Sequence, residues 1–502
     1  KYRMYLAGVL LAIALGQVIV GLFQFAKHPD YMLFGYEEGD ASNPNYIFKI
    51  FLGIHRFPSG NRASGQYISP NHFAGYLEVV GIIGLSLVFW STWKPVTKIL
   101  AIWATVPAFL GVLISGSRGG YLSTLFCLVV FCALGLTAIK VAYPERMVRV
   151  VLIGGAVVLL LGGALSFFIM SSTSVKNRAG NIIDEKNMRL GMWHAALEQT
   201  ALQPVAGTGS GTYLYYGRKF REPGLREDPI RVHNDYLDLL AEYGVLGVAG
   251  FLVFLVLHLW NGMHTFFWLL CKRLQFSADW RSSSLALNIG CLCAVAAYLV
   301  HSIFDFNLHI PANALLMAFV FGILANPGLE TSHETKATAK TSRAFQFLLP
   351  ALGLFLLVLA LARLPGEWYA EKARVALRDG QFLDSTAAAR DGLRWDKGNP
   401  YLYYYGGEAQ RHMGDLFPIP AMARPYYEAA SDQFKKGIAL FPEDENLLVI
   451  EGWTLDTIGE HDEAGKYFQQ ALDWDPNSED VQQYEFTHTE ILKQSDSPGP
   501  GQ

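Results

Sequence analysis

Long runs of apolar residues alternate with polar segments along most of this chain. Nine runs approach or reach the roughly 20 residues that cross the ~30 Å hydrocarbon core of a bilayer as a helix. They lie at about 4–25, 72–90, 97–115, 120–139, 150–170, 243–268, 285–304, 311–325 and 344–364. The pattern predicts an all-α fold, a polytopic transmembrane helical bundle. Because the chain starts with Lys1 and the first run follows almost at once, we expect N-terminal sequence, with further spans, to be missing.

From residue 366 the pattern changes to charged, Tyr-rich and Ala-rich sequence that is typical of a soluble domain. Segments 436–442 and 470–476 align with a period of 34 residues and keep their proline. This period resembles the tetratricopeptide repeat, a pair of antiparallel helices that usually binds a protein partner. We therefore expect a transmembrane domain over 1–364, a repeat domain over 366–492, and a disordered tail over 493–502. A structural cap over the membrane domain is the alternative role for the repeats.

Basic residues in the short connections orient the spans. They gather in alternate connections, as Lys94 and Lys98, then Lys140, Arg146 and Arg149, then Lys272, Arg273 and Arg281, then Lys336, Lys340 and Arg343. The positive-inside rule places these connections in the cytoplasm. The opposite side then holds the long loops 26–71 and 171–242 and the C-terminal domain.

Composition narrows the classes of partner and cofactor. Only 17% of residues are charged and the net charge is −4, which does not indicate a nucleic-acid partner. All five cysteines lie in or beside apolar runs, without zinc-ligand spacing or a disulfide framework. We therefore predict no nucleic-acid partner, no zinc site built from cysteines and no cofactor, and a chain surrounded by membrane lipids.

Ionisable residues mark the non-cytoplasmic ends of the spans: Glu78, Arg118, Glu242, His301 and Asp305. Such groups are costly near lipid and usually face a cavity or a partner. Their gathering on one side predicts a site that opens to that side. A transporter more often places such groups near the bilayer midplane within repeated halves, and no such symmetry is detectable in this sequence.

Four polar motifs lie on this same side. The first runs from Arg62 to Leu77, RASGQYISPNHFAGYL, and enters a span. The second is SGSRGGYL, with Arg118 at its centre. The third, in the 171–242 loop, joins RLGMW, PVAGTGSGT and HNDYLDLLAEYG, and the last is HSIFDFNL. The glycine-rich PVAGTGSGT follows no strand, so we reject a nucleotide-binding interpretation in favour of a flexible turn.

Together the motifs resemble the O-antigen ligase and O-antigen polymerase family of bacterial membrane glycosyltransferases, over roughly residues 60–325. The resemblance implies transfer of a glycan from an undecaprenyl-diphosphate carrier to an acceptor, at the periplasmic face of the inner membrane. It also implies that the reaction needs neither metal nor nucleotide sugar. The acceptor is lipid A-core in a ligase, the growing glycan in a polymerase, or a protein in an O-oligosaccharyltransferase, and we favour the ligase. The span count is lower than is usual for the family, and many ligases lack the repeat domain.

Within the resemblance, His233, Arg118 and Arg189 are the predicted catalytic residues. A neutral imidazole takes a proton from a hydroxyl near neutral pH, and guanidinium groups neutralise phosphate oxygens. The predicted substrate-binding residues are Arg62, Asn71, His72, Arg178, Trp193 and Asn234.

Each of these residues also has an ordinary structural explanation. Arg118 could reach the interface as a snorkelling side chain, and the loop arginines could be solvated. His233 could bond the backbone at a helix start, where Asn234 or Asp235 would cap the helix. Asp238 and Glu242 share a helix face, so one of them could orient His233. A lipid-linked glycan transporter and a scaffold that acts through its repeats are the rival functions.

Overall fold

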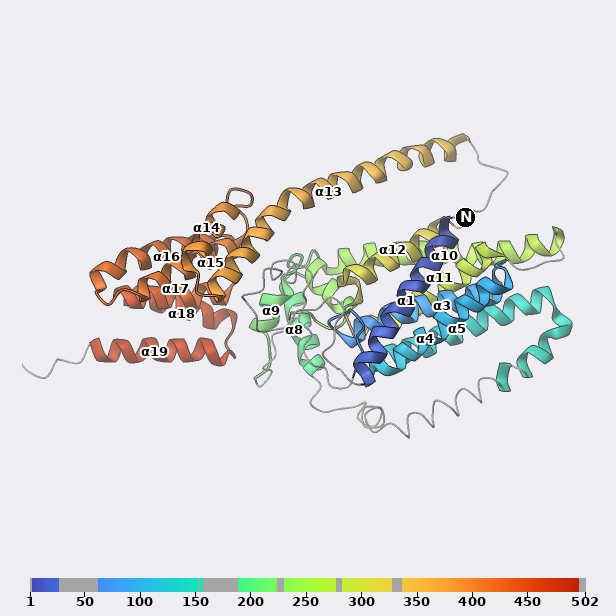
Figure 1. Ribbon diagram of the computed structural model, residues 1–502, viewed down its shortest axis with the longest axis horizontal. Helices are drawn as coiled ribbons and strands as arrows, with labels where there is room; N and C mark the ends of the chain where they lie inside the picture. The colour runs from blue at the N-terminus through green and yellow to red at the C-terminus, as the bar shows by residue number, and fades with distance from the viewer. Residues whose placement is uncertain are drawn as a thin grey trace, which may run out of the picture. The chain divides into compact units, whose positions relative to one another are not determined.

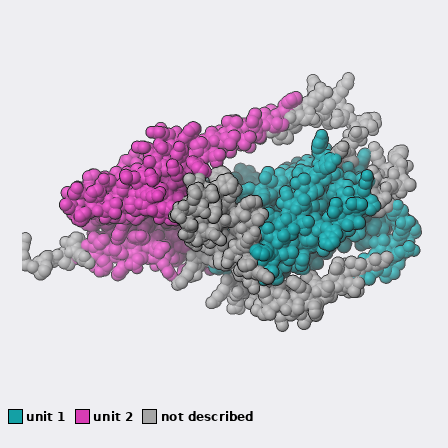
Figure 2. All heavy atoms as spheres, in the orientation of Figure 1, with its two compact units in different colours: residues 1–210, 231–330 teal, residues 211–230, 331–502 magenta. Residues whose placement is uncertain are grey.

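The computed structural model describes residues 2–26, 62–152, 154–156, 188–223, 230–276, 282–326 and 336–495, and every regular element in them is a helix. This confirms the all-α prediction. The chain divides into two compact units, shown in different colours in Figure 2. Unit 1 comprises residues 1–210 and 231–330, and unit 2 comprises residues 211–230 and 331–502.

Unit 1 is a bundle of apolar helices (Figure 1). Its elements are α1 (Tyr2–Ala26), α3 (Pro70–Trp90), α4 (Pro95–Ser115), α5 (Arg118–Ala142), the short helix η1 (Pro144–Arg146), α8 (Met188–Leu202), α10 (Asp235–Phe276), α11 (Ser283–His301), the short helix η2 (Asn307–His309) and α12 (Pro311–Ala325). Within the described residues, 7 helices are long and apolar enough to cross a membrane, the seventh being part of α13 in unit 2. The chain is therefore a multi-pass membrane protein.

The predicted spans agree with these helices except at two places. The run at 311–325 forms α12, which has 15 residues and is shorter than an ordinary membrane-spanning helix. The run at 150–170 lies largely outside the described residues, as does most of the loop 26–71.

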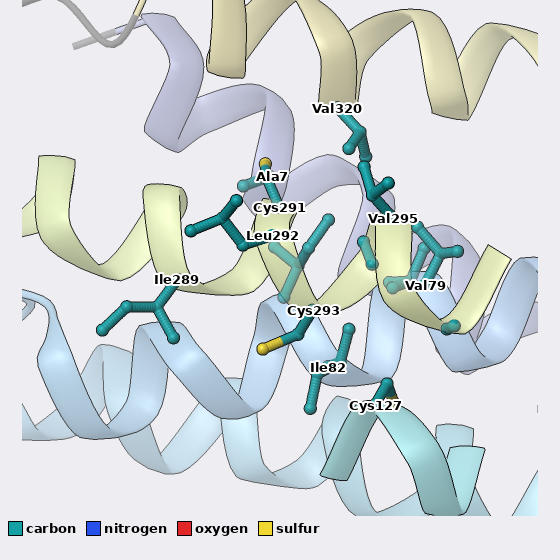
Figure 3. Close-up of a cluster of buried hydrophobic side chains, with 14 of the residues drawn as sticks. Ala7, Val79, Ile82, Cys127, Ile289, Cys291, Leu292, Cys293, Val295 and Val320 are labelled. Atoms are coloured by element: carbon teal, nitrogen blue, oxygen red, sulfur yellow. The ribbon is translucent and has the colours of Figure 1, made fainter. Parts of the chain in front are cut away.

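Helices α3 and α11 form the centre of unit 1. Of the residues in their most apolar stretches, 83% and 72% are buried, far more than in the other spans. The two helices pack against each other. Figure 3 shows their core, where side chains of α1, α3, α5, α11 and α12 meet, among them Val79, Cys127 and Cys293. The cysteines are free thiols within this apolar packing.

A buried polar group crosses this core. His301 Nδ1 lies 2.9 Å from Glu78 Oε1, and both side chains are 1% exposed. Ser123 of α5 donates a hydrogen bond to the same carboxylate. A buried charge is stable only when it is paired and hydrogen-bonded, so these three side chains hold α3, α5 and α11 in one register.

Helix α10 is kinked where a loop packs against its backbone. Gly244 has φ 62° and ψ −167°, so it leaves the helical conformation. The freed amides of Val245 and Leu246 donate to the carbonyls of Pro204 and Val205, at 2.9 and 3.1 Å. In return, the amide of Gly209 donates to Glu242 O at 3.0 Å. The glycine-rich turn is thus held against α10 by backbone bonds, which is its observed role in place of the predicted flexible turn.

Unit 2 is a series of helices in which neighbours in sequence pack against each other. Its elements are α9 (Tyr213–Lys219), α13 (Lys336–Arg378), α14 (Phe382–Gly392), α15 (Pro400–Asp415), α16 (Pro420–Leu440), α17 (Glu445–Ile458), α18 (His461–Trp474) and α19 (Glu479–Ser495). Each helix from α13 to α19 packs on the next one in the chain. Phe434 and Phe468 fill two of the interfaces, against Gly407 and Gly452. Assignment of these helices to the tetratricopeptide class stays a prediction.

Candidate active site

His233 lies two residues before the start of α10, in an uncommon backbone conformation. Its φ is 55°, the one positive value at a non-glycine residue in the described part of the chain. A side chain in this region costs about 1–3 kcal/mol and persists only where its surroundings enforce it. The imidazole is 32% exposed, and its Nδ1 lies 3.4 Å from Asp305 Oδ1. The strained backbone thus presents a partly open imidazole against a buried carboxylate.

A second histidine contacts the same oxygen of Asp305. His72 Nε2, from the first turn of α3, lies 3.5 Å from Asp305 Oδ1. Phe306 separates the two imidazoles and makes edge contacts with both, at centroid distances of 4.7 and 4.8 Å. The predicted residues His72 and His233, more than 150 positions apart in the chain, therefore converge on one carboxylate.

The surroundings of Asp305 keep it negatively charged. Its side chain is 1% exposed. Burial raises the pKa of this carboxyl, but the close approach of the His233 and His72 imidazoles outweighs burial and holds the pKa well below its usual range. An ionised Asp305 stabilises positive charge on either imidazole, which is the property required behind a histidine that accepts a proton.

Arg118 begins α5 at the edge of this cluster. Ser117 caps the helix by accepting a hydrogen bond from the amide of Gly120. Arg118 is exposed and makes no ion pair or hydrogen bond with another described residue. The next residue, Gly119, packs against His301 and Phe304, where a Cβ would come within 3.1 and 3.3 Å. The arginine turn is therefore packed beside the segment that carries Asp305. A free guanidinium at a helix N-terminus provides two sources of positive potential for an anion.

Arg62 and Asn71 support the arginine turn. Arg62 Nε donates to the Ser115 carbonyl and its Nη2 donates to Asn71 Oδ1, both at 2.8 Å. The turn thereby gains a fixed link to the start of α3, where His72 follows. These bonds give Arg62 and Asn71 a positioning role, and their contact with substrate stays a prediction.

Asn234 caps α10, as expected for one of two candidates. Its Oδ1 accepts from the amides of Tyr236 and Leu237 at 3.0 and 3.2 Å. Asp235 has another role, because its Oδ2 accepts from Tyr298 and Ser302 of the α11 end, both at 2.8 Å. The start of α10 is thus fixed to α11, and His233 is fixed with it. Contact of Asn234 with substrate stays a prediction.

The carboxylates of α10 face Arg231. Arg231 Nη1 lies 3.6 Å from Asp238 and 3.5 Å from Glu242, both of which are buried. The sequence suggested one of these two for orienting His233, whereas the structure gives that contact to Asp305. Asp238, Glu242 and His309 bring ligand atoms within 4.8 Å of one another, a grouping with the composition of a metal site. The guanidinium of Arg231 already supplies positive charge to both carboxylates.

The remaining predicted residues lie in the long loop. Arg189 and Trp193 are one turn apart on α8, both partly buried, and α8 packs against α10. Their roles in catalysis and in substrate binding stay predictions. Arg178 lies outside the described residues.

Sequence reasoning did not identify two contributors, the Asp305 contact and Arg231. Asp305 was recognised as a polar residue at a span end, but its pairing with histidines from two distant motifs depends on tertiary packing. A signal for Arg231 was present, because it lies seven residues before Asp238, yet charge patterns predict partners only within regular helices.

Comparison with known families identifies part of the chain. Residues 103–252 match the family model described as O-antigen ligase. That stretch includes Arg118, Arg189 and His233, and it ends before Asp305. No curated protein matches the sequence.

Proposed function

We propose that this chain, in which residues 103–252 form a domain of the O-antigen ligase family, transfers a glycan from an undecaprenyl-diphosphate carrier to a hydroxyl acceptor. The family domain and the membrane-spanning helices support a membrane glycosyltransferase of the ligase and polymerase type. The donor, the acceptor and the periplasmic location of the site belong to the proposal.

The observation that carries the proposal is the contact between His233 and Asp305. A partly exposed imidazole lies 3.4 Å from a carboxylate that is almost fully buried. This is the arrangement of a general base with an orienting group, in which the carboxylate stabilises the imidazolium that forms. A transporter would need no such pair.

In the proposed reaction, the acceptor hydroxyl gives its proton to His233. The hydroxyl oxygen forms a bond to the anomeric carbon of the glycan, and the bond from that carbon to the diphosphate oxygen breaks. The lipid diphosphate departs with the bonding electron pair, and attack from the opposite face inverts the anomeric centre. Asp305 stabilises the charged imidazole until the proton leaves to solvent.

Arg118 and Arg189 supply positive charge for the leaving group. Charge grows on the diphosphate as its bond to the sugar breaks, and a preorganised guanidinium stabilises that charge more in the transition state than in the ground state. Arg118 is the stronger candidate, because it is exposed at the start of α5 and its turn is packed beside the Asp305 segment. Arg189 is proposed because its motif lies within the matched family domain.

The acceptor divides the family into three activities. Lipid A-core, the growing glycan and a protein hydroxyl all present the same nucleophile, so the His233 site suits each of them equally. We favour the ligase, as the description of the matching family does.

The test is transfer by the full chain in liposomes, using an undecaprenyl-diphosphate glycan with a labelled sugar. Acceptors are offered separately: lipid A-core, free donor glycan, and a serine-containing peptide. The proposal expects a labelled covalent product with lipid A-core, resolved by mass spectrometry. Movement of label between leaflets without any covalent product would instead identify a transporter.

A further inference from the structure

A short part of the long loop belongs structurally to the C-terminal unit. Residues 211–223, which we call the docked segment, lie in the chain between α8 and α10 of unit 1. Their contacts nevertheless group them with α13–α19 in unit 2. Tyr213 is fully buried in this arrangement. A loop segment that packs on helices more than 200 residues later in the chain needs specific contacts.

The strongest of these contacts is a buried ion pair. Arg221 Nε and Nη2 donate to Asp475 Oδ1 at 3.0 and 2.7 Å, and Nη2 also donates to Oδ2 at 2.5 Å. The two side chains are 8% and 5% exposed. Asn477 donates to the Arg221 carbonyl at 2.8 Å. The connection between α18 and α19 therefore recognises both the side chain and the backbone of Arg221.

A second ion pair binds the segment at another helix. Arg218 Nη1 donates to Glu445 Oε2 at 2.6 Å, at the start of α17, and both side chains are nearly buried. Aromatic contacts complete the surface, with Tyr216 edge-on to Trp474 at 5.5 Å and Lys219 above the same ring at 4.3 Å. Two points of attachment on different helices set the orientation of the segment as well as its position.

The energetics make this contact selective. A buried carboxylate or guanidinium that loses its partner remains desolvated and unpaired, which is strongly unfavourable. The acidic residues Glu445 and Asp475 are thus complementary to two arginines spaced as Arg218 and Arg221 are. The docked segment matches them in charge, in spacing and in its aromatic neighbours.

We propose that the C-terminal helices are an anchor whose ligand is the chain's own loop, and that this anchor positions the residues on either side of the docked segment. On one side the chain continues to the turn at 204–209, which packs on α10. On the other side it returns through Arg231 to His233. The binding of the segment stands on its own contacts, whereas the effect on transfer rests on the proposed function.

The experiment measures protection of the segment from trypsin in the full chain. The segment offers cleavage after Lys219, and cleavage there is followed by mass spectrometry. Asp475→Lys removes the partner of Arg221 and is expected to speed this cleavage by about tenfold or more. Asp473→Lys makes the same charge change at an exposed site two residues away and is expected to leave cleavage unchanged.

A double variant with the two charges exchanged distinguishes loss of the ion pair from misfolding of the single variant. The double variant Arg221→Asp with Asp475→Arg restores an opposite pair and is expected to return cleavage to within about threefold of wild type. The anchor is overturned if Asp475→Lys is cleaved no faster than Asp473→Lys, or if the exchange leaves the segment as open as the single variant.

Transfer is then measured on the same proteins. Positioning predicts that Asp475→Lys lowers transfer and that the exchange restores it. Unchanged transfer in a variant whose segment has opened would overturn positioning. Absence of transfer in wild type would overturn the proposed function, while the protection result would still decide whether the segment is anchored.

Discussion

At the scale of single residues, the site depends on one buried carboxylate shared by two histidines. His233 reaches Asp305 from a strained backbone position, and His72 reaches it from the start of α3. Neither imidazole is adjacent to Asp305 in sequence, so both depend on the packing of α3, α10 and α11. The sequence contained every residue of this group, but only tertiary structure shows which carboxylate serves which histidine.

Replacing Asp305 with asparagine tests this arrangement. The amide keeps the shape but loses the charge that stabilises an imidazolium, so we expect kcat for transfer to fall about tenfold to hundredfold, with little change in the KM for the donor. Glu145→Gln, a neutral substitution at an exposed carboxylate, is the matched control. A variant with wild-type kcat would show that Asp305 has only a structural role.

At the scale of elements, the long apolar runs predicted the helices of unit 1 well, because span length follows from bilayer thickness. The kink in α10 was not predictable from periodicity. It depends on backbone hydrogen bonds that Val245 and Leu246 donate to a turn about forty residues earlier, and the spacing of apolar residues gives no information about such bonds. The docked segment was not predictable for the same reason, because its arginines pair with carboxylates more than 200 residues away in the chain.

Two glycines with nearly equal φ test the packing of the glycine-rich turn. Gly207 has φ 73° and its Cβ would overlap the backbone of Glu242, whereas Gly211 has φ 75° and open space around it. We expect Gly211→Ala to cost about 1 kcal/mol from backbone strain alone, and Gly207→Ala to cost about 3 kcal/mol or more. Thermal unfolding in detergent measures both. Equal losses would mean that the close approach at Gly207 does not contribute.

The helices of unit 2 contain a buried acid that makes stability depend on pH. Burial raises the pKa of Glu451 to about 7, against the opposing bonds of Ser431 and Lys435. Because the folded pKa exceeds the unfolded one, the stabilising contribution is complete below about pH 4.5 and is lost as pH rises through about 7. The full effect is of the order of 3 kcal/mol.

Glu451→Gln removes this titration. We expect wild-type unit 2 to lose stability between pH 5 and pH 8, and the variant to lose clearly less. Fluorescence of Trp453, which packs in the same helical core, follows the unfolding. Glu428→Gln, at an exposed position of α16, is the control and should behave as wild type does. Parallel pH curves for wild type and Glu451→Gln would contradict the assignment.

At the scale of the whole molecule, the positive-inside rule makes a prediction about sidedness. It places the connection after α3 in the cytoplasm and the loop that contains residue 222 in the periplasm. In a chain without native cysteines, Glu222→Cys should react with a membrane-impermeant maleimide added outside intact spheroplasts, and Lys94→Cys should react only after the membrane is opened. Both positions are exposed in the structure. The reverse labelling pattern would invert the proposed orientation.

The most direct test of the central claim compares transfer by His233→Ala and Arg118→Ala with two matched controls. His194→Ala removes an exposed histidine of α8, and Arg149→Ala removes an exposed arginine from a connection assigned to the opposite side. With labelled undecaprenyl-diphosphate glycan and lipid A-core in liposomes, we predict at least about a hundredfold loss for His233→Ala and Arg118→Ala, and near-wild-type rates for the controls. Turnover within about threefold of wild type in both site variants would contradict the assignment of His233 as base and Arg118 as phosphate ligand.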